Sequence, residues 1–320
     1  MISVIGGSGF IGSVFCEILK KYKISFNILD IKINNTFKNE TIFCDVRNRD
    51  QLFNSLANTS CIINLAAEHS DNLDPITLYY DTNVEGAQNI CDVSSQLQIR
   101  KIIFTSTSAV YQLNTIKTSR DEDCPIGPFN HYGKSKLLAE KIFCNWKKSN
   151  DLNSLIIIRP CVIFGENNRG NFYNLIKTID EKKFLMVGNG KNFKSLAYVK
   201  NFAEFLYYLI NFKRISSFHL INYSDTPHMT IKEIVNYIYE CLKIRKSFFY
   251  IPKLPVLILF KILDLFPFLK NRLSISYIRI KKFTSTTLLE SKFDKLGFVP
   301  NYSIKEGIRN MIQSEFKKNI

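Results

Sequence analysis

The chain has 320 residues, enough for one large domain or two modest ones with a substantial core. Its 46% hydrophobic and 22% charged residues are ordinary for a soluble globular protein. The formal net charge of +15 favours polyanionic partners, namely nucleotides, nucleic acid or an anionic membrane face. Solvated surface lysine explains this charge equally well. Because no five-residue basic block or RNA-binding signature accompanies it, we expect no nucleic-acid partner.

Cysteine and histidine usage argues against disulfides and metal. The eight cysteines include no CxxC pair, and several lie in apolar runs, where free cysteine behaves as a small hydrophobe. The four histidines form no cluster with acidic residues at metal-ligand spacing. The first apolar run is short and breaks into Gly6-Gly7, so no signal peptide is visible. We therefore expect a cytoplasmic protein without a metal site.

A glycine-rich turn lies almost at the start of the chain. The apolar run 2–5 suits a buried parallel strand, and residues 10–22 carry a helical apolar pattern. Gly6, Gly9 and Gly12 therefore lie between a strand and the helix that follows it. The unpaired N–H groups and the dipole of such a helix start favour a pyrophosphate, and glycine is needed where a Cβ would block the turn. The turn predicts dinucleotide binding.

Short apolar runs and helical stretches alternate through the first half of the chain, and this rhythm predicts an α/β fold with a doubly wound parallel sheet of the Rossmann type. After Pro160 the rhythm loosens. We expect residues 1–160 to form the dinucleotide-binding domain, and 161–320 a smaller mixed α/β substrate-binding part with some segments returning to the first domain. The expected strands are 26–31, 41–44, 61–65, 101–105 and 155–158, and the expected helices are 51–57, 76–97, 132–148, 231–242 and 304–316.

An acidic residue ends the second expected strand. Asp30 follows the glycine turn by roughly 20 residues, where a carboxylate accepts hydrogen bonds from an adenosine ribose. This position favours NAD over NADP. Lys32 lies close enough to tolerate a 2′-phosphate, so NADP stays open, and a solvated loop aspartate is the alternative interpretation.

Two groups of side chains suggest redox chemistry on a hydroxyl. Tyr132 and Lys136 are four residues apart at a helix start and share one face. We expect the ammonium group to favour the phenolate and to lower the tyrosine pKa, so that the pair moves a sugar hydroxyl proton while hydride moves to or from nicotinamide. The run 104–111 delivers hydroxyl groups to the carboxyl end of the sheet, where ligands bind. Each feature by itself also has a purely structural interpretation: Tyr132 and Lys136 as structural or solvated helix residues, and 104–111 as a loop rich in Ser and Thr.

The combination resembles the extended short-chain dehydrogenase/reductases, specifically the NAD-dependent nucleotide-sugar epimerase/dehydratase group. The resemblance covers essentially the whole chain through segments 6–12, 30, 44–46, 64–67, 83–86, 106–111, 132–136 and 159–160. It implies that Thr107, Tyr132 and Lys136 are catalytic, with Ser108 a weaker candidate than Thr107. The cofactor-binding residues that it implies are Gly6, Ser8, Gly9, Phe10, Ile11, Gly12, Asp30, Asp45, Val46, Leu65, Ala66, Ala67, Asn83, Tyr132, Lys136 and Pro160.

Departures from the family pattern narrow the reaction. Ser108 and Ala109 occupy positions where family dehydratases place an acid, which disfavours dehydration and decarboxylation. Val162 replaces an asparagine that contacts the substrate phosphate in many epimerases, and Lys194 replaces an arginine that grips the diphosphate. Lysine supplies charge without the bidentate fork. The substrate-binding residues expected from the resemblance are Ser108, Asn171 and Lys194.

The expected activity is epimerisation at C4 of a UDP-hexose or UDP-N-acetylhexosamine, for surface polysaccharide biosynthesis. The main alternative is a nucleotide 4-keto-sugar reductase that uses NAD(P)H. A steroid-type ketoreductase and a non-catalytic nucleotide-sensing protein are further alternatives. The resemblance also implies a homodimer.

The apolar stretch 254–269 is too short and too interrupted to span a bilayer. It suits a core, a partner subunit or weak peripheral contact with the inner membrane face.

Overall fold

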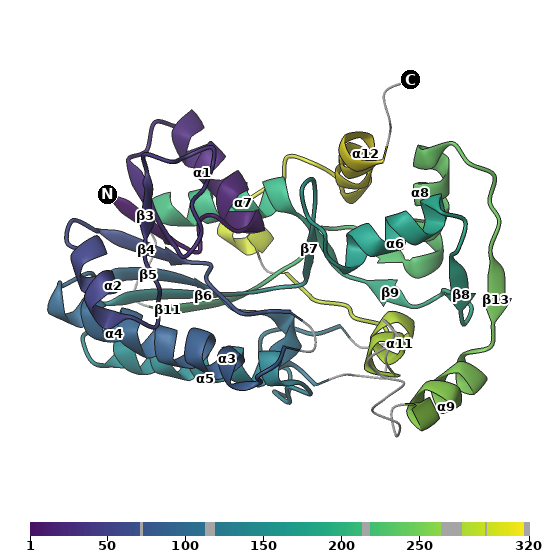
Figure 1. Ribbon diagram of the computed structural model, residues 1–320, viewed down its shortest axis with the longest axis horizontal. Coiled ribbons are helices and arrows are strands. Elements are labelled where there is room, and N and C mark those ends of the chain that lie inside the picture. The colour runs from purple at the N-terminus through teal and green to yellow at the C-terminus, as the bar shows by residue number, and fades with distance from the viewer. Residues whose placement is uncertain (71–72, 113–118, 213–217, 264–276, 292, 317–320) are drawn as a thin grey trace.

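The computed structural model describes residues 1–70, 73–112, 119–212, 218–263, 277–291 and 293–316. A seven-stranded sheet in the order β11-β6-β5-β4-β1-β2-β3, parallel at every pair, lies at its centre (Figure 1). The doubly wound parallel sheet is confirmed, and the strands predicted at 26–31, 41–44, 61–65, 101–105 and 155–158 lie within two residues of the observed bounds. The strands are β1 Ile2–Ile5, β2 Phe26–Asp30, β3 Thr41–Phe43, β4 Cys61–Asn64, β5 Lys101–Thr105, β6 Ser154–Pro160 and β11 Phe218–Tyr223.

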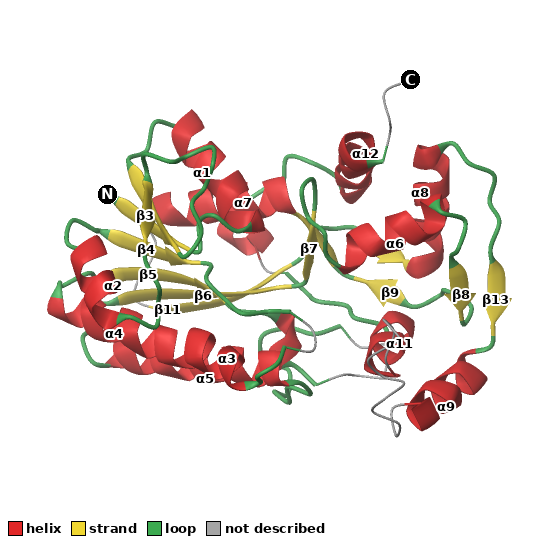
Figure 2. Cartoon of the chain, viewed as in Figure 1, coloured by secondary structure: helices red, strands yellow, loops and turns green. Residues whose placement is uncertain are grey.

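Helices cover both faces of the sheet (Figure 2). Consecutive residues of a buried parallel strand point to opposite faces, and Val4 and Ile5 accordingly belong to two different hydrophobic clusters. One cluster joins the sheet to α1 and α7, and the other joins it to α2, α4 and α5. These helices are α1 Phe10–Lys21, α2 Arg49–Ser55, α4 Gly86–Gln96, α5 His131–Lys148 and α7 Val199–Asn211.

The single helix expected at 76–97 is interrupted. The structure has α3 Thr77–Tyr80, a π-helical turn η1 Asp81–Glu85 and then α4. The apolar periodicity predicted the helix, and it carries no signal for one wide turn because i→i+5 bonding is a local rearrangement.

The second part packs around a third hydrophobic cluster, beyond the carboxyl ends of the sheet strands (Figure 1). Segments from the second half return to the sheet: β11 pairs with β6, α7 packs against α1, and Phe293 packs in the same hydrophobic cluster as α7. The strands of this part are β7 Val162–Phe164, β8 Leu185–Val187, β9 Phe193–Lys194, β10 Leu196–Tyr198, β12 Met229–Thr230 and β13 Phe249–Ile251. Its helices are α6 Asn171–Asp180, α8 Ile231–Leu242, α9 Lys253–Leu263, α11 Tyr277–Thr284 and α12 Ile304–Glu315. The chain also has short 3-10 turns, which are η2 Ser108–Val110, after β5, and η3 Phe293–Leu296, after α11.

Among the described residues, none of the helices has the length and apolar character needed to cross a membrane. The apolar stretch 254–269 is described only as far as residue 263, in α9, so residues 264–269 lie outside the described part of the chain.

Candidate active site

The glycine turn is closed so tightly that side chains would not fit. Gly6 has φ +78°, and a Cβ there would lie 2.6 Å from the backbone N of Ala66. A Cβ on Gly12 would lie 2.5 Å from the Cα of Gly7. The cap position of α1 is Gly9, and the first turn of this fully described helix holds no acidic side chain, whereas α8 and α12 both begin with a capping box. The N–H groups of α1 are therefore available to an anion.

Asp30 is anchored beside this turn. Its two carboxylate oxygens accept hydrogen bonds at 3.0 Å from the backbone N–H groups of Ser8 and Lys32. The Ser8 hydroxyl donates to the carbonyl oxygen of Lys32 at 2.7 Å. The end of β2 and the glycine turn are thus held together, and the carboxylate retains lone pairs for a ribose hydroxyl.

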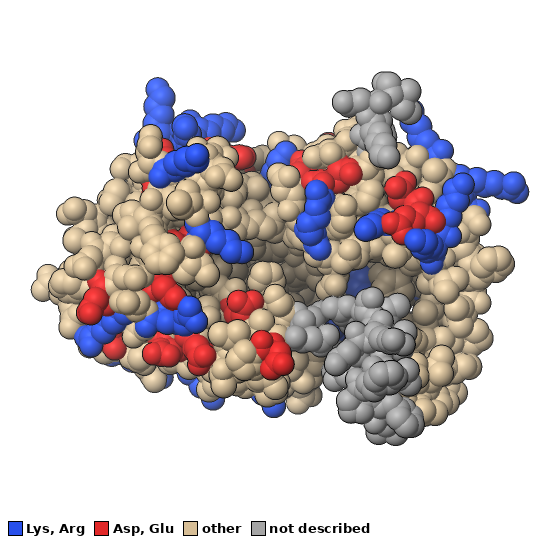
Figure 3. Space-filling model, in the orientation of Figure 1, with Lys and Arg blue, Asp and Glu red and all other residues tan. Residues whose placement is uncertain are grey.

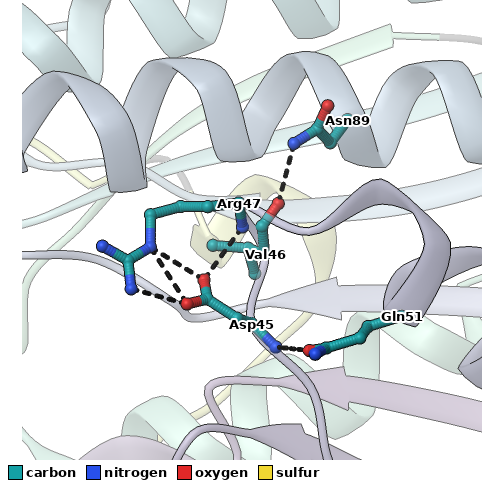
Figure 4. A network of polar contacts seen from close by, with 5 residues as sticks. All are labelled: Asp45, Val46, Arg47, Gln51 and Asn89. Carbon is teal, nitrogen blue, oxygen red and sulfur yellow. Dashed lines mark hydrogen bonds and ion pairs between the residues drawn. The ribbon is translucent and has the colours of Figure 1, made fainter.

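Asp45 and Val46 lie after β3 in a network of polar contacts (Figure 4). The carboxylate of Asp45 accepts from Arg47 Nε at 2.9 Å and from Arg47 Nη2 at 2.5 Å, and these bonds lower the pKa of Asp45. The backbone N–H of Asp45 donates to Gln51, and the carbonyl oxygen of Val46 accepts from Asn89 at 3.1 Å. Arg47 was not predicted from the sequence. Its position two residues after Asp45 is the signal that could have indicated the ion pair.

Asn83 connects the end of β4 to the helix that carries Tyr132. It lies in the π turn η1, where its side chain accepts from the backbone N–H of Glu68 at 2.9 Å and donates to the Glu68 carbonyl oxygen at 3.0 Å. It also donates to the Ser135 hydroxyl on α5 at 2.9 Å. The segment that contains Leu65, Ala66 and Ala67 is therefore tied to α5.

The structure brings Thr107 and Tyr132 together from two elements. Asn130 caps α5 by accepting from the backbone N–H of Gly133, and a Cβ on Gly133 would lie 2.5 Å from the carbonyl oxygen of Ala109. The start of α5 consequently approaches η2, which Thr107 caps by accepting from Ala109 N at 3.1 Å. The Thr107 side chain hydrogen-bonds to Tyr132.

The expected direction of the Tyr132 pKa shift is wrong for this structure. Burial raises the pKa of Tyr132 to about 12, and the hydrogen bond with Thr107 offsets only part of that effect. Lys136 is 1% exposed, and its Nζ lies 4.2 Å from the centre of the Phe104 ring. Burial lowers the pKa of Lys136 to about 7, although the charge of Glu140 raises it. For the pKa of Tyr132, desolvation therefore has a larger effect than the closeness of Lys136 on the same helix.

A buried ionic network supports this part of α5. Glu140, one turn after Lys136, accepts from Arg159 Nε at 2.9 Å, from Arg159 Nη2 at 2.6 Å and from the Ser106 hydroxyl at 2.5 Å. Arg159 also donates to the Tyr111 hydroxyl at 3.0 Å. The network joins α5, β6 and the hydroxyl-rich segment after β5. Sequence reasoning missed Glu140, whose helical spacing from Lys136 was a usable signal.

The expected substrate-binding residues lie on separate elements. Ser108 is half-buried in η2, and Asn171 is exposed as the first residue of α6. Lys194 Nζ donates to the carbonyl oxygens of Lys282 at 2.5 Å and Ser285 at 2.7 Å. Lys282 Nζ in turn lies 4.7 Å from the centre of the Phe129 ring, so α11 links Lys194 to the segment before α5.

The remaining expected cofactor residues are part of the same sheet edge. Phe10 and Ile11 form the start of α1, and Pro160 is buried as the last residue of β6. Within the described ranges, no group of three or more His, Cys, Asp and Glu side chains is arranged to hold a metal ion.

Comparison with known proteins identifies the family. Residues 2–222 match the model of the NAD dependent epimerase/dehydratase family. The chain is 39% identical over 98% of its length, and 95% of the relative's, to the N-acetyl-alpha-D-glucosaminyl-diphospho-ditrans,octacis-undecaprenol 4-epimerase of Escherichia coli O157:H7. It is 29% identical to the mouse sterol-4-alpha-carboxylate 3-dehydrogenase, decarboxylating, over 62% of this chain and 56% of that one.

The UDP-N-acetylglucosamine 4-epimerase of Bacillus cereus has the same fold. The two structures superpose with a TM-score of 0.77 at 19% identity, covering 98% of this chain and 99% of that one. The predicted family and the prediction of an enzyme are both confirmed. This chain belongs to the NAD-dependent epimerase/dehydratase family.

Proposed function

We propose that this protein is an NAD-dependent 4-epimerase of an N-acetylhexosamine carried on a diphosphate. The observation that carries the proposal is the contact of Thr107 with Tyr132, with Lys136 one helical turn further on. These groups lie where β5 and α5 meet, at the ligand-binding edge of the sheet. The relative from Escherichia coli O157:H7, which matches almost end to end, supports both the position of reaction and the sugar.

The described residues fit NAD. The open N-terminus of α1 suits the pyrophosphate, and Asp30 suits the adenosine ribose, where a 2′-phosphate would meet a carboxylate. Asp45 and Val46 suit the adenine, with the segment of Leu65, Ala66 and Ala67 alongside the cofactor. When bound, NAD accepts a hydride from C4 of the sugar and returns it. NADP is the less suitable alternative.

The side chains supply the proton transfer. In its phenolate form, Tyr132 would take the proton of the C4 hydroxyl as hydride leaves C4, which would leave a 4-keto sugar. After the sugar has turned over and hydride has returned to its other face, Tyr132 would return the proton to the oxygen and become the phenolate again. Thr107 holds the sugar oxygen against Tyr132, and the ammonium group of Lys136 stabilises the phenolate during the transfer.

Two diphosphate carriers fit this chemistry. The sequence favours UDP, whereas the name of the relative from Escherichia coli O157:H7 favours a polyprenyl diphosphate. In both cases Lys194, Asn171 and Ser108 are the residues that we propose for the substrate.

The test is incubation of pure protein with UDP-N-acetylglucosamine and, separately, with N-acetylglucosaminyl-diphospho-undecaprenol, both without added reductant. Formation of the C4 epimer from either substrate supports the proposal, and Tyr132→Phe is the control for contaminating activity. A second incubation supplies NAD(P)H and a nucleotide 4-keto sugar. Consumption of one NAD(P)H per 4-keto sugar there, with no epimer formed in the first incubation, supports the 4-keto-sugar reductase instead. Lack of any reaction with either carrier would overturn the proposal.

Other parts of the proposal concern the setting of the enzyme. We place it in surface polysaccharide biosynthesis in the cytoplasm, as a homodimer with weak peripheral contact to the inner membrane face. The division into a dinucleotide-binding domain, residues 1–160, and a substrate-binding part, residues 161–320, belongs to the same proposal. Resemblance to the mouse sterol dehydrogenase supports a steroid-type ketoreductase as a weaker candidate.

A further inference from the structure

Helix α9 presents an apolar surface that no other described element covers completely. All of its residues, which the structure describes throughout, are at least partly exposed. Leu254, Ile258 and Ile262 follow one another at helical i, i+4 spacing, and Leu254 is 68% exposed. On a globular protein, large apolar side chains grouped in this way mark a contact surface.

The neighbouring strand pair extends this surface. β13 pairs in parallel with β8 and leads directly into α9, so the three elements form one flank of the second part (Figure 1). Phe249, which is 76% exposed, and Tyr250 of β13 lie on it together with Leu185 of β8. Figure 3 shows the charged side chains in the same view. We call the exposed side chains of α9, β13 and β8 the apolar flank.

Basic residues frame the apolar flank. Lys253 and Lys261 are exposed on α9, whose sequence from 253 to 263 contains no acidic residue. Arg245 is exposed in the segment before β13, and the neighbouring Lys246 is exposed as well, with its Nζ 3.3 Å from Glu240 Oε1. Apolar side chains bordered by cations complement a membrane surface, where acyl chains meet anionic head groups.

A cluster of basic side chains lies near the first residue of α9, Lys253. Arg120 is only 6% exposed, and its buried Nη2 has no hydrogen-bond partner among the described residues. A buried guanidinium N–H without a partner is costly, and an anion would satisfy it. Arg120 and Lys194 lie beside the same segment, since Arg120 N donates to the carbonyl oxygen of Leu288 at 3.0 Å and Lys194 forms a β-bridge with Thr287. Burial lowers the pKa of Lys194 to about 7, and the charges of Arg120, Lys253 and Lys282 also lower it. Lys253 thus belongs both to this cluster and to α9.

We propose that the apolar flank rests in an anionic bilayer, and that Arg120 and Lys194 bind the diphosphate of a sugar carried on a membrane polyprenol. The inference rests on the proposed function and names its carrier. The diphosphate lies at the head-group level of a bilayer, next to Lys253 at the start of α9. Lys282, which contacts both Lys194 and Phe129, continues the path toward the catalytic helix.

The membrane contact is tested by sedimentation of the full chain with vesicles of phosphatidylcholine and phosphatidylglycerol. We expect the wild type to sediment with vesicles that contain phosphatidylglycerol, and the double variant L254E/I258E to lose at least tenfold in partitioning because it buries two charges. The matched control is Val299→Glu, at an exposed apolar residue outside the apolar flank. Equal sedimentation of the double variant and the wild type would overturn the proposal. So would a wild type that stays off vesicles and forms a dimer through the apolar flank.

Activity separates this inference from the proposed function. The double variant is expected to keep wild-type turnover of the sugar on a short, water-soluble prenyl diphosphate, and to lose at least tenfold on the undecaprenyl substrate in vesicles. If neither form reacts with the wild type, the proposed function fails. If both react and the double variant is unimpaired in vesicles, the membrane inference fails.

The diphosphate site is tested by Arg120→Met. We expect at least tenfold weaker binding of inorganic pyrophosphate, measured by calorimetry, and a matching rise in KM for the short prenyl substrate with little change in kcat. Arg120→Lys keeps the charge, so an intermediate loss is expected and guards against a misfolded methionine variant. Pyrophosphate binding equal to wild type in both variants would overturn the assignment.

Discussion

Lys136 and Lys194 are both buried lysines whose pKa is lowered to about 7, yet their surroundings are opposite. Lys136 lies against the Phe104 ring, within the field of the carboxylate of Glu140. Lys194 is surrounded by other cations and donates to backbone carbonyl oxygens. Lys136, which we propose as catalytic, therefore has a carboxylate within the fold to balance its charge, whereas Lys194, which we propose for the substrate, lies among cations that a diphosphate would balance.

The largest effect on kcat is expected from removing the hydroxyl group of Tyr132, whose phenolate we propose that Lys136 stabilises. Tyr132→Phe should lower kcat by about 10³-fold, because proton transfer to and from the sugar oxygen is lost. NAD binding, measured by fluorescence titration, should change little. The control is Tyr22→Phe, at an exposed tyrosine that follows the C-terminal end of α1, the end opposite the glycine turn. Turnover within tenfold of wild type would refute the role of Tyr132.

Replacing Lys136 and Lys194 separately with methionine should affect different kinetic constants, because the two lysines have different surroundings. Lys136→Met is expected to reduce kcat by about 10²-fold, since phenolate stabilisation is lost in the transition state. Lys194→Met is expected to raise KM about tenfold and to leave kcat nearly unchanged, because ground-state and transition-state binding weaken equally. Steady-state kinetics on one substrate measure both. A fall in kcat from Lys194→Met would remove the distinction.

A smaller effect should follow from Glu140→Gln. Lys136 is charged below its pKa of about 7, and Glu140 raises that pKa. Loss of the carboxylate, which also leaves Arg159 uncompensated, lowers the pKa further. The decline of kcat/KM with increasing pH should therefore move to lower pH by about one unit, measured on protein whose folding is checked by circular dichroism. An unchanged pH profile would show that Glu140 does not control the protonation of Lys136.

The smallest effect concerns Lys253, which is exposed and therefore screened by solvent. Removing its charge in Lys253→Gln should let Lys194 stay protonated to higher pH, because the two cations repel each other. The rise of KM with pH should move upward by about half a unit. Lys261→Gln, on the same helix, is the matched control and should leave the profile in place.

Features that are local in the sequence could be predicted. The glycine turn, Asp30 and the Tyr132–Lys136 spacing each require only a few neighbouring residues, and strand positions followed from short apolar runs. The direction of the Tyr132 pKa shift could not, because spacing gives proximity but not desolvation. Arg120 was also missed, since only the folded chain brings it and Lys194 to the same segment, 287–288.

The return of β11 to the sheet has a consequence for dividing the gene. β11 pairs with β6 along its length, and residues 155–158 of β6 are all apolar and buried. Residues 1–160 expressed by themselves would end in an uncovered apolar edge strand, which recruits other chains and leads to aggregation. The first half therefore depends on six residues encoded far downstream for its solubility, and truncation is a poor route to an isolated cofactor domain.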